Sequence, residues 1–218
     1  RGYEKTRKVM RLNRFLGELV GGPGVMGEWS YIFCLFGLPS IKQPWGWQLF
    51  GHHLALNCLF IDQQMVLTPT FMGAEPTYAD EDPFMDLRAF QDEERIGLEF
   101  MRSLSPEQRS KALIANSMVG GDLPSGRRQV GDGLHLGGAY QDNRIIPYEG
   151  VKGAAFTLQQ KKDLLDLTQQ YLCTLPPGPM EARMSDIDRY LDETHFCWIG
   201  SRNTYEPFYY RIQSPVVL

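Results

Sequence analysis

The chain has 218 residues, of which 43% are hydrophobic, and a formal net charge of −4. Its basic residues form no long run beyond residues 5–14 and pairs such as Arg127 and Arg128, so the charge pattern does not predict nucleic acid as a partner. No apolar run reaches the ~18 residues of a membrane-spanning helix, so we expect a soluble chain without a membrane partner. The length suits one sizeable hydrophobic core, and we expect a single domain over residues 1–218.

The cysteines are widely spaced, form no CxxC pair and have apolar neighbours; they are Cys34, Cys58, Cys173 and Cys197. This pattern predicts buried free thiols rather than disulfides or a zinc site. A reducing, cytoplasmic location follows as an expectation, and secretion stays open if a leader was removed, because the chain begins at Arg1 rather than Met. The chain also stops within the apolar residues 216–218, so we expect that a C-terminal continuation is missing.

Periodicity and turn residues predict an α+β fold, a mainly antiparallel sheet flanked by several helices. Residues 4–19 follow a helical pattern that ends in a glycine-rich stretch. Residues 27–37 are aromatic and branched, which predicts a buried strand. The longest β signal covers residues 45–61 and a second covers residues 65–72, so the short polar break between them predicts a hairpin.

The second half of the chain is predicted to be more helical. We expect helices over residues 83–103, 105–115, 157–172 and 180–191, and a second hairpin over residues 195–199 and 207–218. Residues 116–153 are rich in Gly, Asp and Arg and lack periodicity. Such a stretch is typical of a binding or lid loop, and equally of a plain surface excursion.

The histidines are the most informative polar residues. His52 and His53 are adjacent on the predicted strand, so we expect their side chains on opposite faces and no shared metal ion. Hairpin register then decides which of the two lies near Glu75. A three-residue loop over residues 62–64 places Glu75 on the His53 face, whereas a two-residue loop places it on the His52 face. We favour the first, because it sets Gly51 opposite the carboxylate and leaves room for a ligand.

The favoured register brings His53, Asn57 and Glu75 together as polar groups on an apolar sheet, which suits a metal ion or a general base. A histidine and a glutamate can equally form an internally satisfied buried pair. His135 is the expected third ligand, since loops close over sheet sites, although it can also be an exposed loop residue. A divalent transition metal held by His53, Glu75 and His135 is therefore the expected cofactor.

Two residues of the C-terminal hairpin are further candidates. His195 opens the strand HFCWIG and is more typical of a strand end than of a ligand, so it ranks with His52 and Asn57 as a secondary site residue. Arg211 lies on an apolar strand, where a guanidinium is costly to bury without an anionic partner. It either pairs with a core carboxylate or holds the acid group of a substrate.

Several unusual runs carry a family resemblance: PWGWQLFGHHLALN, TPTFMGAEP, LSPEQRSKAL, HFCWIG and EPFYYRIQSP. They resemble the DUF 3500 family, a domain of unknown function found in bacteria and fungi, over residues 10–218. The resemblance implies no reaction, but it marks Trp45, Trp47, Gly51, His52, His53, Pro69, Gly73, Glu75, Pro76, Tyr210 and Arg211. It also implies a continuation with an acidic residue and further histidines, often as HxH, which this sequence lacks, so a metal site here is expected to be incomplete.

Two functions stay open from the sequence. The first is a metal-dependent enzyme, a hydrolase or an oxidoreductase, that acts on a small molecule through the catalytic residues His53, Glu75 and Arg211. The second is a non-catalytic domain that binds a small molecule or a partner and whose histidines are structural. Nucleotide-binding glycine motifs, GxSxG and HExxH are absent, so none of those three classes of site is predicted.

Overall fold

The structure, a computed structural model, describes residues 1–118, 122–123 and 145–218. It is a mixed α+β structure with an antiparallel four-stranded sheet and a second, smaller sheet, as the sequence predicts. The chain divides into two compact units, which are Arg1–Gln91 with Leu172–Glu181, and Asp92–Tyr171 with Ala182–Leu218. A single domain over residues 1–218 stays a prediction.

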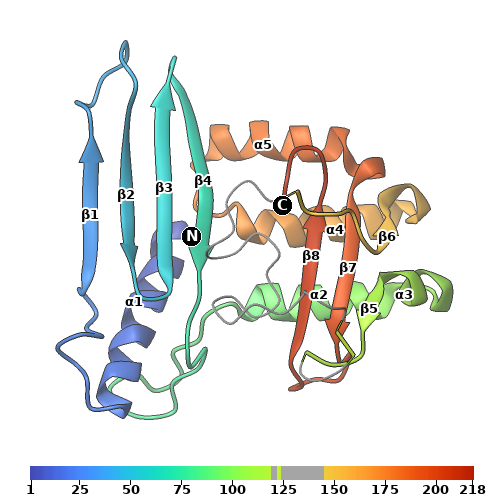
Figure 1. The fold of residues 1–218 in the computed structure, drawn as a ribbon, viewed down its shortest axis with the longest axis horizontal. Helices are drawn as coiled ribbons and strands as arrows, with labels where there is room; N and C mark the ends of the chain where they lie inside the picture. Colours follow the sequence, from blue (N-terminus) through green and yellow to red (C-terminus); the bar gives the residue numbers. More distant parts are fainter. Residues whose placement is uncertain (119–121, 124–144) are drawn as a thin grey trace. The chain divides into compact units, whose positions relative to one another are not determined.

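The first unit is an antiparallel sheet with a helix against one face. Its elements are α1 (Gly2–Leu19), β1 (Tyr31–Phe36), β2 (Trp45–Gly51), β3 (Leu54–Ile61) and β4 (Gln64–Met72). The strands lie in the sheet in chain order, and Figure 1 shows α1 behind them. Val9 and Met10 of α1 pack on the buried Leu54 and Leu56, so the helix covers the end of the sheet where β2 turns into β3.

The strand β1 is an edge strand and differs from the buried strand expected over residues 27–37. Among the described strands it pairs with β2 alone. The side chains of Ile32, Phe33 and Phe36 are 57%, 61% and 53% exposed. An apolar composition favours a buried strand, but a strand is buried only where another element packs against it.

Residues 45–61 form two strands, and the expectation of one long strand is wrong. His52 and His53 make a two-residue turn, and Gly51 of β2 pairs with Leu54 of β3 across it. His53 adopts a φ of 60°. Histidine is among the few non-glycine residues that are enriched in this left-handed region, so the turn forms without glycine or asparagine. The two turn positions themselves are histidines rather than usual turn residues, so the available signals were Gly51 directly before them and the excessive length of the run for one strand.

The register expected for the next hairpin is also wrong. Asp62 and Gln63 form a two-residue turn, and Ile61 pairs with Gln64 rather than with Met65. Both turn residues have positive φ, 48° and 63°. Turns of this kind match the right-handed twist of the strands they join, which favours the shorter loop.

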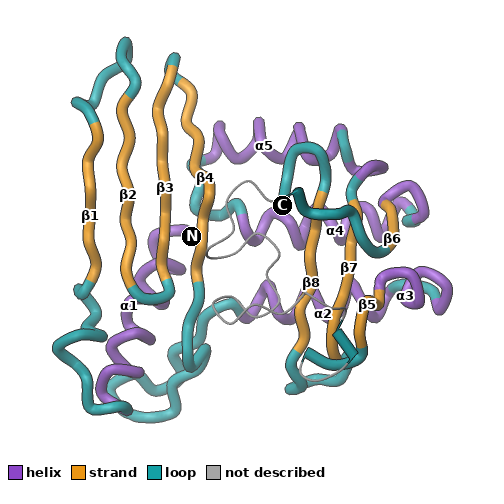
Figure 2. The backbone as a smooth tube through the Cα atoms, viewed as in Figure 1, coloured by secondary structure: helices purple, strands orange, loops and turns teal. Residues whose placement is uncertain are grey.

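The second unit is centred on the antiparallel pair β7 (His195–Gly200) and β8 (Phe208–Gln213), with β5 (Leu113–Ala115) and β6 (Val151–Lys152) beside β7. Figure 2 shows helices behind these strands. The helices are α2 (Gln91–Ser103), α3 (Pro106–Ala112), α4 (Leu158–Tyr171) and the part of α5 (Pro177–Arg189) that follows Glu181, with short 3-10 turns at Gly153–Ala155 and Leu191–Glu193. No helix within the described residues is long and apolar enough to cross a membrane.

The core of the second unit lies on one face of β7 and β8. Strand alternation places Phe196 and Trp198 of β7 on this face, opposite Ile212 and Tyr210 of β8. Both β7 side chains are fully buried, and Phe100 of α2 packs edge-on against Phe196. The strand β7 is covered on both faces, since every residue after His195 in it is buried, whereas most residues of β8 are half-buried.

The helix expected over residues 83–103 begins only at Gln91. The backbone N–H of Ala79 donates to the carbonyl of Leu87, and the N–H of Asp86 donates to the carbonyl of Ala79. Phe84 packs against Phe15 of α1. These tertiary contacts hold the residues before α2 in a loop and override their helical pattern.

The helix α3 is held by a capping box. Ser105 Oγ accepts a hydrogen bond from the N–H of Gln108, and Gln108 Oε1 accepts one from the N–H of Ser105. Thr157 and Gln160 repeat this exchange at the start of α4. Both helices therefore begin where the sequence expects them.

We expect Ser105→Ala to lower the free energy of unfolding by about 1 kcal/mol, because it removes the acceptor of a helix-terminal N–H. Urea unfolding followed by circular dichroism measures this change. The matched control is Ser110→Ala, which alters an exposed serine within the same helix and leaves the cap intact. Equal stability of the Ser105→Ala protein and the parent would contradict the prediction.

Candidate functional site

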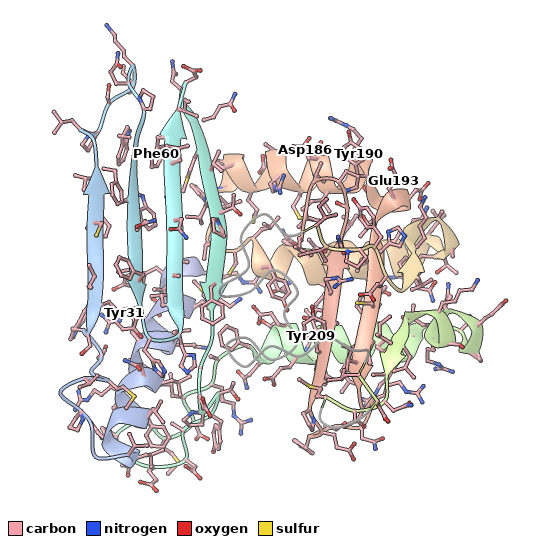
Figure 3. All side chains as sticks on the ribbon, in the orientation of Figure 1. Tyr31, Phe60, Asp186, Tyr190, Glu193 and Tyr209 are labelled. Carbon is pink, nitrogen blue, oxygen red and sulfur yellow. The ribbon has the colours of Figure 1, made fainter. Side chains whose placement is uncertain are left out.

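The turn that contains His52 and His53 lies at one end of the β1–β4 sheet. Tyr31 marks this end and Phe60 the other in Figure 3. The two imidazole rings lie next to each other, with 3.9 Å between their centroids. The expectation that they face opposite sides of the sheet is wrong, because they sit in a turn and strand alternation does not apply to them.

His52 anchors the turn to its surroundings. Its Nδ1 lies 2.8 Å from Asn13 Oδ1 on α1, and its carbonyl accepts a hydrogen bond of 3.0 Å from the Tyr31 hydroxyl. The Asn13 side-chain nitrogen donates in turn to the Gly27 carbonyl. Burial raises the pKa of Tyr31 to about 12, so its hydroxyl keeps its proton and remains a donor.

His53 faces Glu75, which follows β4. Its Nε2 lies 3.9 Å from Glu75 Oε2, too far for a hydrogen bond, and the Glu75 side chain is 81% exposed. The Nε2 atom is buried and has no hydrogen-bond partner within the described part of the chain. The Gly73 N–H donates to the His53 carbonyl at 2.8 Å, which holds the segment after β4 against the turn.

Two effects lower the pKa of His53 below its ordinary value of 6.5. Burial of the ring is the larger, and the neighbouring His52 adds to it, whereas the charge of Glu75 acts in the opposite direction. The imidazole is therefore neutral at pH 7. In the tautomer with a proton on Nδ1, its Nε2 presents a free lone pair beside a carboxylate.

The expected metal ligands are brought together only in part. His53 and Glu75 are neighbours, while His135 lies outside the described residues. Asn57 takes part in a different contact: it accepts from Gln48 and donates to the Pro69 carbonyl. Over residues 1–118, 122–123 and 145–218, no three His, Cys, Asp or Glu side chains form a group that could hold a metal ion. Metal binding stays a prediction.

Arg211 occupies a separate polar cluster in the second unit. Its Nη2 donates to Glu149 Oε2 at 2.7 Å and to the Pro147 carbonyl at 3.0 Å. Of the two alternatives for this arginine, a core carboxylate is the partner found. The Nη1 atom is nevertheless buried and has no hydrogen-bond partner among the described residues.

His195 and Gln213 lie beside Arg211 in the same hairpin. They face each other across β7 and β8, and the Tyr148 ring lies 4.9 Å from the His195 ring. Sequence reasoning missed Gln213, although its position two residues after Arg211 on one strand was a usable signal. It also missed Glu149, which no periodic pattern marks.

The cysteines are free, as the sequence predicts. Cys58 and Cys197 are buried, whereas Cys34 and Cys173 are only half-buried. Burial raises the pKa of the Cys58 thiol, which keeps it protonated and unreactive at neutral pH.

A family model described as "Protein of unknown function (DUF3500)" matches residues 1–218. The chain belongs to the DUF3500 family. The match confirms the resemblance carried by the sequence motifs and spans the whole chain. No curated protein and no solved structure matches this DUF3500 protein. The family description assigns no reaction.

We expect the pKa of His53, measured by the NMR titration of its ring protons, to lie below 6.5. Glu75→Gln should lower it further, because the carboxylate charge is what raises it. The exposed Glu81→Gln is the matched control and should leave it unchanged.

The same shift predicts how stability depends on pH. Folding disfavours the protonated ring, so the contribution of His53 to the free energy of unfolding is complete above pH 6.5 and is lost as the pH falls through the lowered pKa. A His53 pKa above 6.5 in the folded protein would contradict both expectations.

Proposed function

We propose that this DUF3500 protein is an enzyme that transfers a proton to and from a small molecule at His53. The observation that supports this is the Nε2 of His53, which is buried and has no hydrogen-bond partner among the described residues, with the Glu75 carboxylate 3.9 Å away. A buried polar atom without a partner costs free energy, and such atoms in a folded protein call for an explanation. Nε2 is closed to solvent in this structure, so the side chains around the ring would have to move before a water molecule or a substrate hydroxyl could donate the missing hydrogen bond.

Hydrolysis of a small ester is the reaction that this arrangement suits. His53 Nε2 accepts a proton from water as the water oxygen forms a bond to the carbonyl carbon. The resulting imidazolium then returns the proton to the leaving alkoxide when the carbon–oxygen bond breaks. The neutral resting state of His53 matches this role, because only a deprotonated ring can accept the first proton.

Glu75 assists by its charge and does not touch the ring through a hydrogen bond. At 3.9 Å its carboxylate attracts the imidazolium that forms during the reaction. Its high exposure lets water screen this attraction, so the effect on the rate is smaller than that of His53 itself. The contact between His52 and Asn13 holds the turn against α1.

A metal-dependent version of this enzyme, either hydrolase or oxidoreductase, stays a prediction from the sequence. It requires a third ligand besides His53 and Glu75, for which His135 is the candidate. Metal analysis of protein purified without a histidine tag tests it: a stoichiometric transition metal that is lost in a His53→Asn variant would support it. A metal-free protein with ester activity would favour the proton-transfer function alone.

We expect His53→Asn to lower kcat/KM for p-nitrophenyl acetate about 100-fold, the usual loss when a general base is removed. Asparagine tolerates the left-handed backbone at this position, so the turn is kept. The matched control is Gln63→Asn, which alters a positive-φ position in the neighbouring hairpin and should leave the rate unchanged.

The pH profile separates a general base from a structural role. The rate should fall as the pH drops through the lowered pKa of His53, and this limb should move to lower pH in Glu75→Gln, because Glu75 raises that pKa. Equal rates for the parent and His53→Asn, with both proteins folded by circular dichroism, would contradict the proposed function.

A further inference from the structure

The C-terminal hairpin presents a polar face on the side opposite the core. Strand register sets His195 against Gln213 and Cys197 against Arg211, and all four residues alternate with the core residues of β7 and β8. Arg211 and Gln213 are each 7% exposed. Two long polar side chains are therefore buried next to each other on a face where apolar residues would pack at lower cost.

The segment over residues 146–149 covers this face. Gln213 Nε2 donates to the Ile146 carbonyl at 2.9 Å, and Arg211 Nη2 donates to Pro147 and Glu149. The next residue, Gly150, has a φ of 92°, and a Cβ at this position would lie 2.0 Å from the Phe196 carbonyl oxygen. Only glycine permits so close an approach, so the backbone presses this segment onto the hairpin.

Three buried polar atoms on this face lack a hydrogen-bond partner in the described protein. They are Arg211 Nη1, His195 Nδ1 and Gln213 Oε1. The first is a donor, the last is an acceptor, and the ring nitrogen takes either role according to its tautomer. The contacts with Glu149, Pro147 and Ile146 use the other atoms of Arg211 and Gln213, so they fix the direction of the unpartnered ones.

The spacing of the three side chains suits one small molecule. Residues that face each other across antiparallel strands have Cβ atoms about 5 Å apart, which applies to His195 and Gln213. Residues two positions apart on one strand are separated by about 7 Å, which applies to Arg211 and Gln213. All three atoms are closed to solvent in this structure, so a ligand of a few heavy atoms would reach them when the covering segment, residues 146–149, moves away from the hairpin.

Charge narrows the class of ligand. Glu149 already neutralises the guanidinium of Arg211 at 2.7 Å, so a dianion would bring two uncompensated charges into a buried site. A monoanion brings one, and it can accept hydrogen bonds from Arg211 Nη1 and His195 Nδ1. Gln213 Oε1 requires in addition a donor on the ligand, beside the anionic group.

We propose that this face binds a small 2-hydroxycarboxylate. Its carboxylate accepts from Arg211 Nη1 and His195 Nδ1, and its hydroxyl donates to Gln213 Oε1. This binding site lies within the second unit and does not rest on the function proposed for His53 in the first unit.

Calorimetric titration of the full chain with sodium glycolate, sodium acetate and sodium phosphate, at constant ionic strength, tests the proposal. We expect glycolate to bind at least tenfold more tightly than acetate, because acetate leaves Gln213 Oε1 unpaired. Phosphate should bind more weakly than glycolate, because of its second charge.

Matched substitutions at His195 locate the binding site. His195→Gln removes the nitrogen at the Nδ1 position and should weaken glycolate binding at least tenfold, whereas His195→Asn keeps an amide nitrogen there and should stay within threefold of the parent. Arg211→Lys should also weaken binding at least tenfold, since lysine cannot pair with Glu149 and present a second nitrogen. Arg95→Lys, on the exposed ion pairs of α2, is the control and should have no effect.

Three results would overturn the proposal. One is glycolate and acetate binding with equal affinity, and another is phosphate binding more tightly than either. The third is the absence of saturable binding of any of the three anions by a folded protein, which would assign the unpartnered atoms to water only. If Arg211→Lys fails to fold, the two variants His195→Gln and His195→Asn still decide the test. His195 is the first residue of its strand and is only half-buried, so we expect both variants to fold.

Discussion

Antiparallel hairpin geometry positions His53 in the first unit and Arg211 in the second. In the first unit a two-residue turn between β2 and β3 takes His53 out of the strand and turns its ring toward Glu75. In the second unit the register of β7 and β8 places Trp198 in the core and Arg211 on the opposite face. A shift of one residue in either register would exchange the faces, so the polar sites and the core depend on the same pairing.

The two sites share a physical feature, a nitrogen that is buried away from water and has no hydrogen-bond partner in the part of the chain that the structure describes. In each case a neighbour holds the rest of the group in place. Gly73 binds the His53 backbone, and Glu149 binds the second nitrogen of Arg211. The burial that lowers the pKa of His53 also keeps its ring neutral, so the same desolvation that costs stability provides a proton acceptor.

The free-energy cost of burying these atoms is large, which suggests that they form hydrogen bonds with a ligand in the functional state. A buried polar group without a hydrogen bond costs about 1–3 kcal/mol, and three of them on one hairpin face approach the ~5–15 kcal/mol by which a whole domain is stable. Arg211, His195 and Gln213 contribute the three atoms. An apolar face would avoid the free-energy cost of these unpaired atoms. The presence of a polar face instead favours a binding role over a purely structural one.

The sequence by itself determined the α+β class, the DUF3500 membership, the capped starts of α3 and α4 and the hairpin of β7 and β8. Each of these depends on local signals, such as a capping box or an apolar run between turn residues, that act over a few positions. Only the tertiary structure decided that His52 and His53 form a turn, because a left-handed histidine is allowed but is not signalled by its type. It also decided that Glu149 pairs with Arg211, 62 positions away, since spacing along a chain carries no information about which loop reaches which strand.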